Sequence, residues 1–390
     1  MVTGPSIAVV TDDTPMSGYD PDSPGRQSSG GTDMLMTPGP TEIPEQIREA
    51  MARSIANPDV DPAFVDTYRS LTADLASVYE TAKDVVVLGG EGVLGLEAAV
   101  ASVIEPGDRV LCVANGLYGE YFAEFVELHG GEPITCSFPW DEPIDPDAVS
   151  EAIDEAKQEG EDVAAATFVH CETPTGTMND LDEALEHCRE AGVLTIVDAV
   201  SSLGGAPVPV GEIDLCIGAS QKCFSAPPGL TTVAVSDAAW ERITGTDTRG
   251  FYTDLGLWRD VGETGEFPYT HLVSNCYGLA EAVSIVLDEG LENGFSRHEA
   301  AAEQCRDLGT EIGLASYPAE ARSAPTVTAF EVEEATVVQE RLHQEHDILV
   351  GTGLADLEDD LIRIGHMGYN ADTERVETTM NALESVLDDR

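Results

Sequence analysis

Short apolar runs alternate with amphipathic stretches along the first two thirds of this chain. We predict that each run of six or seven residues is a buried strand: 84–89, 109–114, 164–170, 193–199, 215–220 and 231–236. Helical patterns separate several of these runs, at 95–104, 119–130, 147–160 and 181–192. Apolar strands joined by helices are typical of a mostly parallel sheet with both faces covered. The pattern therefore predicts an α/β fold.

The pattern changes after a long predicted helix at 277–290. A second helix at 295–313 follows, and then two shorter strands at 326–332 and 360–367 precede a final helix at 371–389. Short strands mixed with helices in this way indicate a smaller α+β unit.

These patterns predict three parts of the chain. Residues 1–33 are rich in Ser, Gly, Asp and Pro, which is the composition of a disordered extension, and Met34 or Met36 is a candidate for the true start. We expect residues 34–285 to form a large domain with an N-terminal arm. Residues 286–390 would form the smaller C-terminal domain.

Acidic residues dominate the charge of the chain. It has 73 Asp and Glu residues against 19 Lys and Arg residues, which gives a formal net charge of -54, and the acids are spread along its whole length. Such a surface repels the phosphates of nucleic acids and anionic membranes, so neither is an expected partner. Molar salt screens this self-repulsion beyond roughly 3 Å. Dispersed acid with so few lysines therefore indicates a halophile's salty cytoplasm.

The eight cysteines show no CxxC motif and no close His/Cys spacing. We therefore predict no metal site and no disulfide framework, and interpret most of them as small buried hydrophobes. No run approaches the ~18 apolar residues of a membrane span, and the N-terminus lacks a basic region followed by an apolar core. A cytoplasmic location is expected.

One of the three lysines, Lys222, follows the strand at 215–220 and precedes the loop "SAPPG". Ligands of open α/β sheets bind at the carboxyl ends of strands, where a desolvated lysine has a lowered pKa and offers a neutral amine for imine formation. The alternative is a surface lysine or one that caps a helix end. Asp198 lies at the end of the strand at 193–199, and a buried carboxylate there needs a partner. The protonated ring nitrogen of pyridoxal phosphate would be one, whereas Asp198 alone would be a helix cap or a turn residue.

Three further features have two readings each. The glycine turn in 88–100 places backbone N–H groups at a helix start, which suits a phosphate but is also a common structural feature. Tyr118 follows the strand at 109–114, where it either stacks on a flat ring or belongs to the core. Arg363 lies on an apolar strand and either pairs with an internal carboxylate or binds one from a substrate.

Together these segments resemble the class V, fold-type I pyridoxal-phosphate aminotransferases, most closely the alanine–glyoxylate and serine–pyruvate aminotransferase group. The resemblance extends from about Met34 to the C-terminus. It rests on "PGPTEIP" near the start, "HCETPTGTMND" (170–180), "VDAVSSLGG" (197–205), "ASQKCFSAPPGL" (219–230) and "RIGHMG" (363–368). The resemblance implies a mostly parallel seven-stranded sheet in a large domain, with a smaller C-terminal α+β domain.

The resemblance also implies a role for each matching residue. Lys222 would form the internal aldimine and move a proton between Cα and C4′, and Asp198 would pair with the ring nitrogen. The other cofactor contacts would come from Val200 and Tyr118 on the two ring faces, Thr173 near the 3′-oxygen, Gln221, the Glu91-Gly92-Val93 loop at the phosphate, and Thr270 of the partner subunit. Arg363 would bind the substrate α-carboxylate, helped by backbone near Gly39. A homodimer with active sites at the subunit interface is implied.

The chain departs from the family at two positions of the phosphate loop. The family usually has Ser or Thr where this chain has Glu91, and His or Thr where it has Val93. A carboxylate beside a phosphate dianion is unfavourable unless it points away, for instance as a helix N-terminal cap. Residues 57–68 are acidic where the family is often basic, which makes the entrance of the site more acidic.

The expected activity is ping-pong transfer of an amino group from alanine or serine to glyoxylate or pyruvate. Relatives with these motifs include pyridoxamine–pyruvate and ureidoglycine–glyoxylate aminotransferases, so the donor stays open. A cysteine desulfurase or related lyase is an alternative, but it usually carries His where this chain has Gln221, and no cysteine follows Cys305. A non-catalytic relative would lack the lysine or the aspartate. His170 and His366 either line the pocket or are structural.

Overall fold

The computed structural model describes residues 34–158, 162–248 and 250–388. The extension predicted at 1–33 lies outside the described residues.

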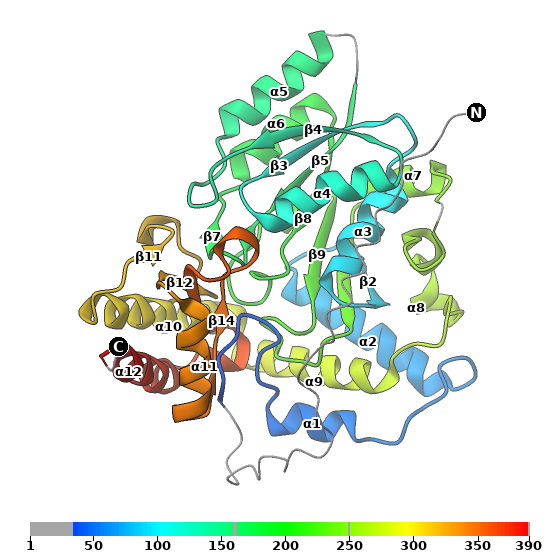
Figure 1. The fold of residues 1–390 in the computed structure, drawn as a ribbon. Coiled ribbons are helices and arrows are strands. Elements are labelled where there is room, and N and C mark those ends of the chain that lie inside the picture. Colours follow the sequence, from blue (N-terminus) through cyan, green and yellow to red (C-terminus); the bar gives the residue numbers. More distant parts are fainter. Residues whose placement is uncertain (1–33, 159–161, 249, 389–390) are drawn as a thin grey trace, which may run out of the picture. The chain divides into compact units, whose positions relative to one another are not determined.

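Within these residues, seven strands form a central sheet in the order β2-β10-β9-β8-β5-β3-β4 (Figure 1). Their bounds are β2 (Asp84–Gly89), β3 (Arg109–Ala114), β4 (Glu132–Ser137), β5 (Val163–Val169), β8 (Leu194–Asp198), β9 (Leu215–Ala219) and β10 (Leu230–Val235). Strand β10 is antiparallel to β2 and β9, and the other neighbours are parallel. The predicted α/β fold with a mostly parallel seven-stranded sheet is confirmed.

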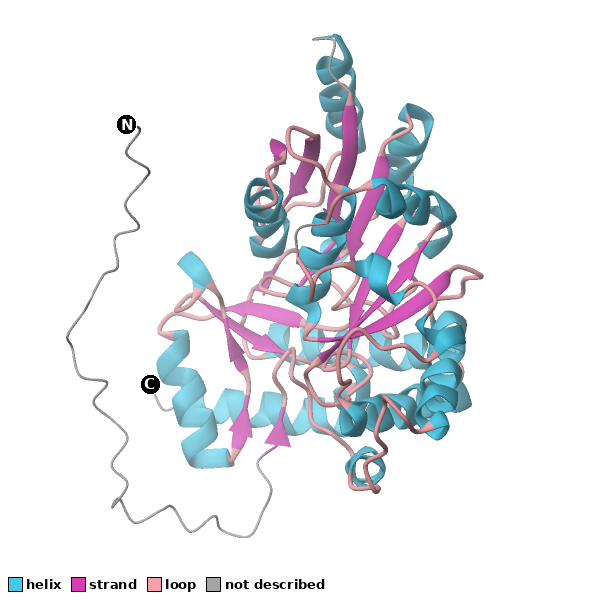
Figure 2. Ribbon diagram, turned by 90° about the vertical axis from the view of Figure 1, so that its right-hand side faces the viewer, coloured by secondary structure: helices cyan, strands magenta, loops and turns pink. Residues whose placement is uncertain are grey.

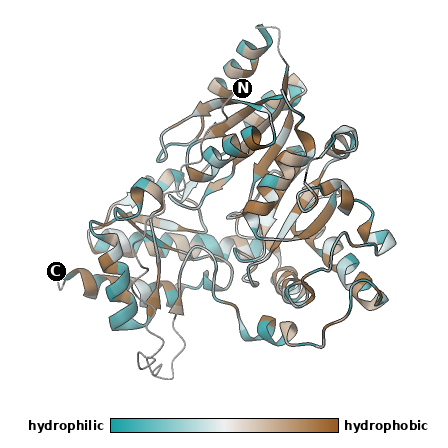
Figure 3. Cartoon of the chain, turned by 45° about the vertical axis from the view of Figure 1, so that its right-hand side comes forward, coloured by the Kyte–Doolittle hydropathy of each residue, from teal (hydrophilic) through white to brown (hydrophobic). Residues whose placement is uncertain are grey.

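Helices connect the strands and pack on both faces of this sheet (Figure 2). The connecting helices are α3 (Gly92–Val103), α4 (Leu117–Leu128), α5 (Pro146–Gln158) and α6 (Asp182–Ala191). Strand residues are mostly fully buried, and Figure 3 shows the strands of the sheet as predominantly hydrophobic. Both-face burial explains why these strands are continuous apolar runs in the sequence.

The sequence pattern missed strand β4, which pairs only with β3 at the edge of the sheet. Its residues are exposed or half-buried, and it contains Pro133. An edge strand of this kind lacks the continuous apolar run that identifies the buried strands. The remaining elements before residue 290 are the helices α1 (Glu45–Met51), α2 (Pro62–Val78), α7 (Asp237–Gly245), α8 (Val261–Thr264) and α9 (Val273–Glu289), and a separate two-stranded sheet of β6 (Cys171–Glu172) and β7 (Thr177–Met178).

A second sheet, with strand order β11-β12-β15-β14, lies in the C-terminal part of the chain. The elements there are α10 (Leu291–Glu311), β11 (Ser316–Tyr317), β12 (Thr328–Glu331), α11 (Ala335–His346), β13 (Ile348–Leu349), β14 (Gly351–Thr352), β15 (Leu361–Ile364) and α12 (Thr373–Asp388). Their apolar side chains form a core separate from that of the large sheet. The boundary predicted at 285/286 falls inside α9, and the division into domains stays a prediction.

The first described residues belong to this second core. Strand β1 (Met34–Leu35) pairs in parallel with β13, and Met36 is fully buried among the core side chains of the C-terminal part. The segment then continues toward the carboxyl end of the large sheet. Among the described helices, none is both long and apolar enough to cross a lipid bilayer.

Candidate active site

Ten of the twelve predicted site residues line one cavity of about 230 Å³. They are Gly39, Glu91, Gly92, Val93, Tyr118, Thr173, Asp198, Val200, Gln221 and Lys222. These residues follow the ends of β2, β3, β6, β8 and β9 or belong to the N-terminal segment. The two exceptions are Arg363 and Thr270.

Lys222 lies in a tightly closed loop after β9. The loop is held by hydrogen bonds from the Ser220 hydroxyl to the Pro227 carbonyl at 2.6 Å and from the Ser225 N–H to the Lys222 carbonyl at 2.9 Å. The Lys222 side chain is 7% exposed, so the surface-lysine alternative is wrong. Burial and the nearby Arg363 lower the pKa of Lys222 to about 8, against the attraction of Asp198. A neutral amine is therefore accessible near physiological pH.

The N-terminal segment covers Lys222. The Lys222 ammonium donates to the Pro38 carbonyl at 2.7 Å. A Cβ at Gly39 would lie 2.5 Å from Lys222 Cδ, and Gly39 has a φ of +104°, so glycine is required there by both space and backbone conformation. Pro38 was not among the site residues predicted from the sequence.

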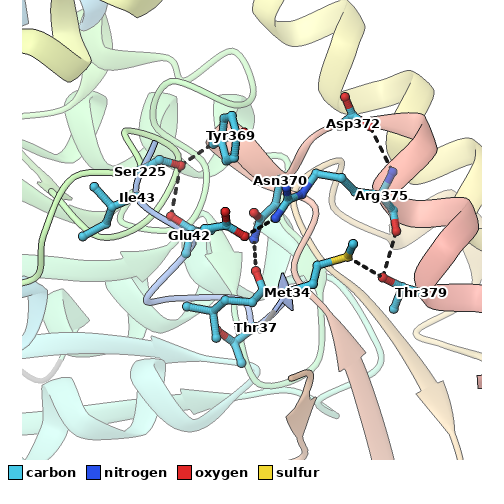
Figure 4. Close-up of polar contacts among 12 residues, drawn as sticks. Met34, Thr37, Glu42, Ile43, Ser225, Tyr369, Asn370, Asp372, Arg375 and Thr379 are labelled. Carbon is cyan, nitrogen blue, oxygen red and sulfur yellow. Dashed lines mark hydrogen bonds and ion pairs between the residues drawn. The ribbon is translucent and has the colours of Figure 1, made fainter. Parts of the chain in front are cut away.

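Contacts with the C-terminal part hold this segment in place (Figure 4). The Asn370 amide donates to the Leu35 carbonyl at 2.7 Å, and Arg375 pairs with Glu42. Ser225 accepts hydrogen bonds from the Thr41 hydroxyl at 3.0 Å and from the Tyr369 N–H at 2.8 Å, which ties the lysine loop to both segments. The position of the Pro38 carbonyl thus depends on contacts distant in sequence.

Asp198 ends β8 and is 4% exposed. Its Oδ1 accepts from the Val200 N–H at 2.8 Å, so it is also the turn residue that the alternative reading described. Burial raises the pKa of Asp198 to about 6, and the Val200 N–H and Lys222 partly offset this rise. A cation beside the carboxylate would stabilise its ionised form.

Arg363 on β15 is 7% exposed and lies next to the cavity without lining it. Its Nε donates to the Thr352 carbonyl at 2.5 Å and its Nη1 to the Thr173 carbonyl at 2.9 Å. Burial lowers the pKa of Arg363 to about 10. No carboxylate of the described residues pairs with it, so the internal ion pair is excluded within that part of the chain.

Glu91 is the N-cap of α3, as the helix-cap reading required. Its Oε1 accepts from the Val93 N–H at 3.2 Å, and its Oε2 accepts from the Gln221 amide at 3.4 Å. A Cβ at Gly92 would lie 3.0 Å from Val200 Cγ2, so glycine lets the helix start pack directly on Val200. The start of α3 and Val200 therefore lie side by side in the wall of the cavity.

Tyr118 lies in the first turn of α4 and is half-buried. A residue that the sequence analysis missed, Glu172, holds this turn: its carboxylate is fully buried and accepts from the Gly119 N–H at 2.8 Å and the Tyr118 N–H at 3.3 Å. Burial raises the pKa of Glu172 to about 8, partly offset by the Gly119 N–H. One sequence feature could have revealed it: an acid two residues after the strand at 164–170. In the structure, a Cβ at Gly116 would lie 2.3 Å from Glu172 Cδ, so glycine is needed there.

Three predicted residues lie away from this cavity. Thr270 is exposed and borders a separate hollow with Ile55 and Leu272, so it does not reach the cavity of its own chain. His170 contacts the Ser202 hydroxyl at 2.8 Å, and His366 contacts the Thr328 hydroxyl at 2.7 Å. Neither histidine lines the cavity, and burial lowers their pKa values, to about 4 and about 3, so the structural reading holds for both.

Comparison with known proteins agrees with this geometry. The chain is 35% identical over 364 residues to an uncharacterized aminotransferase of Methanocaldococcus jannaschii, covering 91% of this chain and 92% of that protein. It is 30% identical to a pyridoxamine–pyruvate transaminase of Mesorhizobium japonicum, covering 90% of each chain. The solved structure of an alanine–glyoxylate aminotransferase from Nostoc sp. superposes with a TM-score of 0.87 at 30% identity, over 92% of this chain and 96% of that one.

The chain belongs to the aminotransferase class-V family, whose model matches residues 36–374. It is an enzyme with the fold of the pyridoxal-phosphate-dependent, fold-type I aminotransferases, and pyridoxal phosphate is its cofactor.

The residues at one end of the cavity fit the ring nitrogen and the aldehyde of this cofactor. Asp198 offers a buried carboxylate to a ring nitrogen, and Lys222 offers an amine of lowered pKa to an aldehyde. At the other end of the cavity the start of α3 offers backbone N–H groups, which suit a phosphate. Glu91 engages one of these groups, the Val93 N–H.

Proposed function

We propose that this aminotransferase moves the amino group of alanine or serine to glyoxylate or pyruvate. The observation that carries the proposal is that Lys222 and Asp198, both buried, line one small cavity with Tyr118 and Thr173. Convergent polar groups in one cavity are typical of a small-molecule site. The Nostoc relative named alanine–glyoxylate aminotransferase supports this substrate class.

Each residue has a defined task in this reaction. Bound pyridoxal phosphate supplies an aldehyde and an electron sink. The Lys222 amine would take the proton from the substrate Cα, and the Asp198 carboxylate would stabilise a positive charge on the ring nitrogen. Tyr118 and Val200 would cover the two ring faces, and Thr173 would lie near the 3′-oxygen.

Arg363 is the proposed site for the substrate carboxylate. Its hydrogen bonds to the Thr352 and Thr173 carbonyls fix the plane of the guanidinium, which suits bidentate binding. Backbone near Gly39 would border the same carboxylate. Both substrates of the ping-pong reaction carry this group, so one arginine serves both half-reactions.

We also propose a homodimer in which Thr270 contacts the phosphate in the partner's cavity. Thr270 is exposed beside Ile55, which is 72% exposed, and Leu272, which is 43% exposed. Large exposed apolar side chains that gather in one place mark interaction surfaces. The eight cysteines are unpaired, which supports the cytoplasm as the location, and the net charge of -54 supports a salty one.

Pyridoxamine is a second candidate amino donor. The Mesorhizobium relative is named for that substrate, and the carboxylate of Glu91 at the phosphate end of the cavity favours a ligand without a phosphate.

A donor-by-acceptor panel in high salt tests the function. Alanine, serine, pyridoxamine and ureidoglycine are each paired with glyoxylate and pyruvate, and the change in cofactor absorbance reports each half-reaction. We expect turnover with alanine or serine that Lys222→Ala abolishes. Full activity of Lys222→Ala would refute the assignment of the site.

A further inference from the structure

The end of the cavity formed by Glu91 and Gln221 presents hydrogen-bond acceptors. Glu91 Oε2 accepts from the Gln221 amide at 3.4 Å. Both oxygens of an ionised carboxylate are hydrogen-bond acceptors. The amide of Gln221 must therefore turn its NH₂ group toward Glu91. Its Oε1 is buried and has no hydrogen-bond partner among the described residues.

Two donors that would serve a phosphate are already engaged. The Val93 N–H donates to Glu91 Oε1 at 3.2 Å, and the Gln221 NH₂ group donates to Glu91 Oε2. A phosphate dianion that takes either donor must displace the Glu91 carboxylate or lie beside it. Like charges at such a distance repel each other, so both outcomes weaken the binding of a phosphate.

Positive charge that would offset this repulsion is sparse in the cavity. Among the described residues that line it, the one cationic side chain is Lys222, whose ammonium donates to the Pro38 carbonyl. The whole chain carries a net charge of -54.

A free hydroxyl has the opposite requirement. The 5′-hydroxyl of pyridoxamine or pyridoxal is a donor, and it can donate to the free Gln221 Oε1 or to Glu91 without displacing an existing hydrogen bond. A buried acceptor without a partner is costly, so a ligand that satisfies it gains binding free energy.

We propose that Glu91 and Gln221 form a discriminating end of the cavity, at which the 5′-hydroxyl vitamers pyridoxamine and pyridoxal bind at least as tightly as their phosphate esters. The proposal rests on the proposed aminotransferase site, whose ring-binding residues are the same for both forms. It makes pyridoxamine and pyridoxal effective competitors of the phosphorylated cofactor.

The test compares the dissociation constants of pyridoxamine and pyridoxamine 5′-phosphate by titration calorimetry at one KCl concentration. Neither compound has an aldehyde, so an imine with Lys222 does not mask the contribution of the phosphate. We expect the wild-type protein to bind pyridoxamine as tightly as its phosphate ester or more tightly. Glu91→Ser keeps a helix-capping hydroxyl. In this variant the ratio of the two dissociation constants should shift by about tenfold or more in favour of the phosphate ester.

Asp145→Ser is the matched control, because the Asp145 carboxylate accepts from the Asp147 N–H at 3.0 Å at the start of α5, outside the cavity. It removes the same charge and the same kind of cap and should leave the ratio unchanged. The proposal would be overturned if the wild-type protein bound the phosphate ester much more tightly than pyridoxamine and Glu91→Ser left the ratio of their dissociation constants unchanged. That result would leave the aminotransferase assignment intact. Failure of both compounds to bind would instead overturn the proposed function.

Discussion

The buried carboxylate of Glu172 and the backbone N–H of Gly119 lie 2.8 Å apart, which joins the segment after β5 to the first turn of α4. Thr173 follows Glu172, and Tyr118 precedes Gly119. Two side chains that line the cavity are therefore positioned by one hydrogen bond between their neighbours.

Glu172→Gln should change how stability depends on pH. Folding raises the pKa of Glu172 from 4.5 to about 8, so the folded state keeps a proton that the unfolded state releases. The contribution of Glu172 to stability is thus complete below pH 4.5 and is lost as the pH rises toward 8. Thermal unfolding of the wild-type protein and of Glu172→Gln at constant salt measures this. The stability of the variant should rise relative to that of wild type across this pH range. A difference that does not vary with pH would contradict the prediction.

The amine of Lys222 should react with aldehydes at a lower pH than an ordinary lysine. Its pKa is about 8 instead of 10.5, so the rate of imine capture of pyridoxal should rise to a plateau with a midpoint near pH 8. Reductive trapping of the adduct followed by mass spectrometry measures this rate. Because Asp198 raises the pKa of Lys222, Asp198→Asn should move the midpoint lower. A midpoint near 10 in the wild-type protein would contradict the structure.

The sequence predicts the parts of the site that follow directly from strand ends. Asp198 and Lys222 each come after an apolar run, and parallel strands bring their carboxyl ends to one edge of the sheet. The carbonyl of Pro38 could not be found in this way, because its place depends on the pairing of β1 with β13 and on contacts such as Asn370 to Leu35. Hydrogen bonds between segments more than 300 residues apart leave no local pattern in a single sequence.

Strand β4 is the part of the central sheet that the sequence did not predict. Periodicity identifies strands through burial, and an edge strand that is exposed or half-buried lacks the apolar run. Glu172 was missed for a related reason: an acid is usually solvated, and the contacts that bury this one, such as the close approach of Gly116, are distant in sequence.

Gly39→Ala should impair the enzyme without unfolding it. The added Cβ would lie 2.5 Å from Lys222 Cδ at a φ of +104°, so either the N-terminal segment or the lysine must move. We expect slower imine capture at Lys222 and a modest loss of stability. Gly245→Ala is the control, because apart from its chain neighbours and its own helix backbone no atom lies within 4 Å of its added Cβ. Equal rates in both variants and wild type would show that the segment does not position Lys222.

Lowering the salt concentration should destabilise the protein. With a net charge of -54, self-repulsion opposes the compact state, and molar KCl screens charges beyond roughly 3 Å. The midpoint of thermal unfolding should therefore rise strongly between dilute and molar KCl. Sucrose separates this effect from general stabilisation, because it favours the folded state without screening charge. An equal rise in sucrose and in KCl would argue against charge screening.

Arg363→Lys tests whether the guanidinium binds the substrate carboxylate or only supports the fold. Lysine keeps the charge but loses the planar fork, so KM for alanine should rise by about tenfold or more. Arg363 also donates to the Thr173 carbonyl, so the variant could act by displacing Thr173 instead. Alaninamide separates the two, because it lacks the carboxylate but uses the same ring-binding residues. A selective loss for alanine assigns the carboxylate to Arg363, whereas equal losses for alanine and alaninamide would mean that Arg363 acts through Thr173.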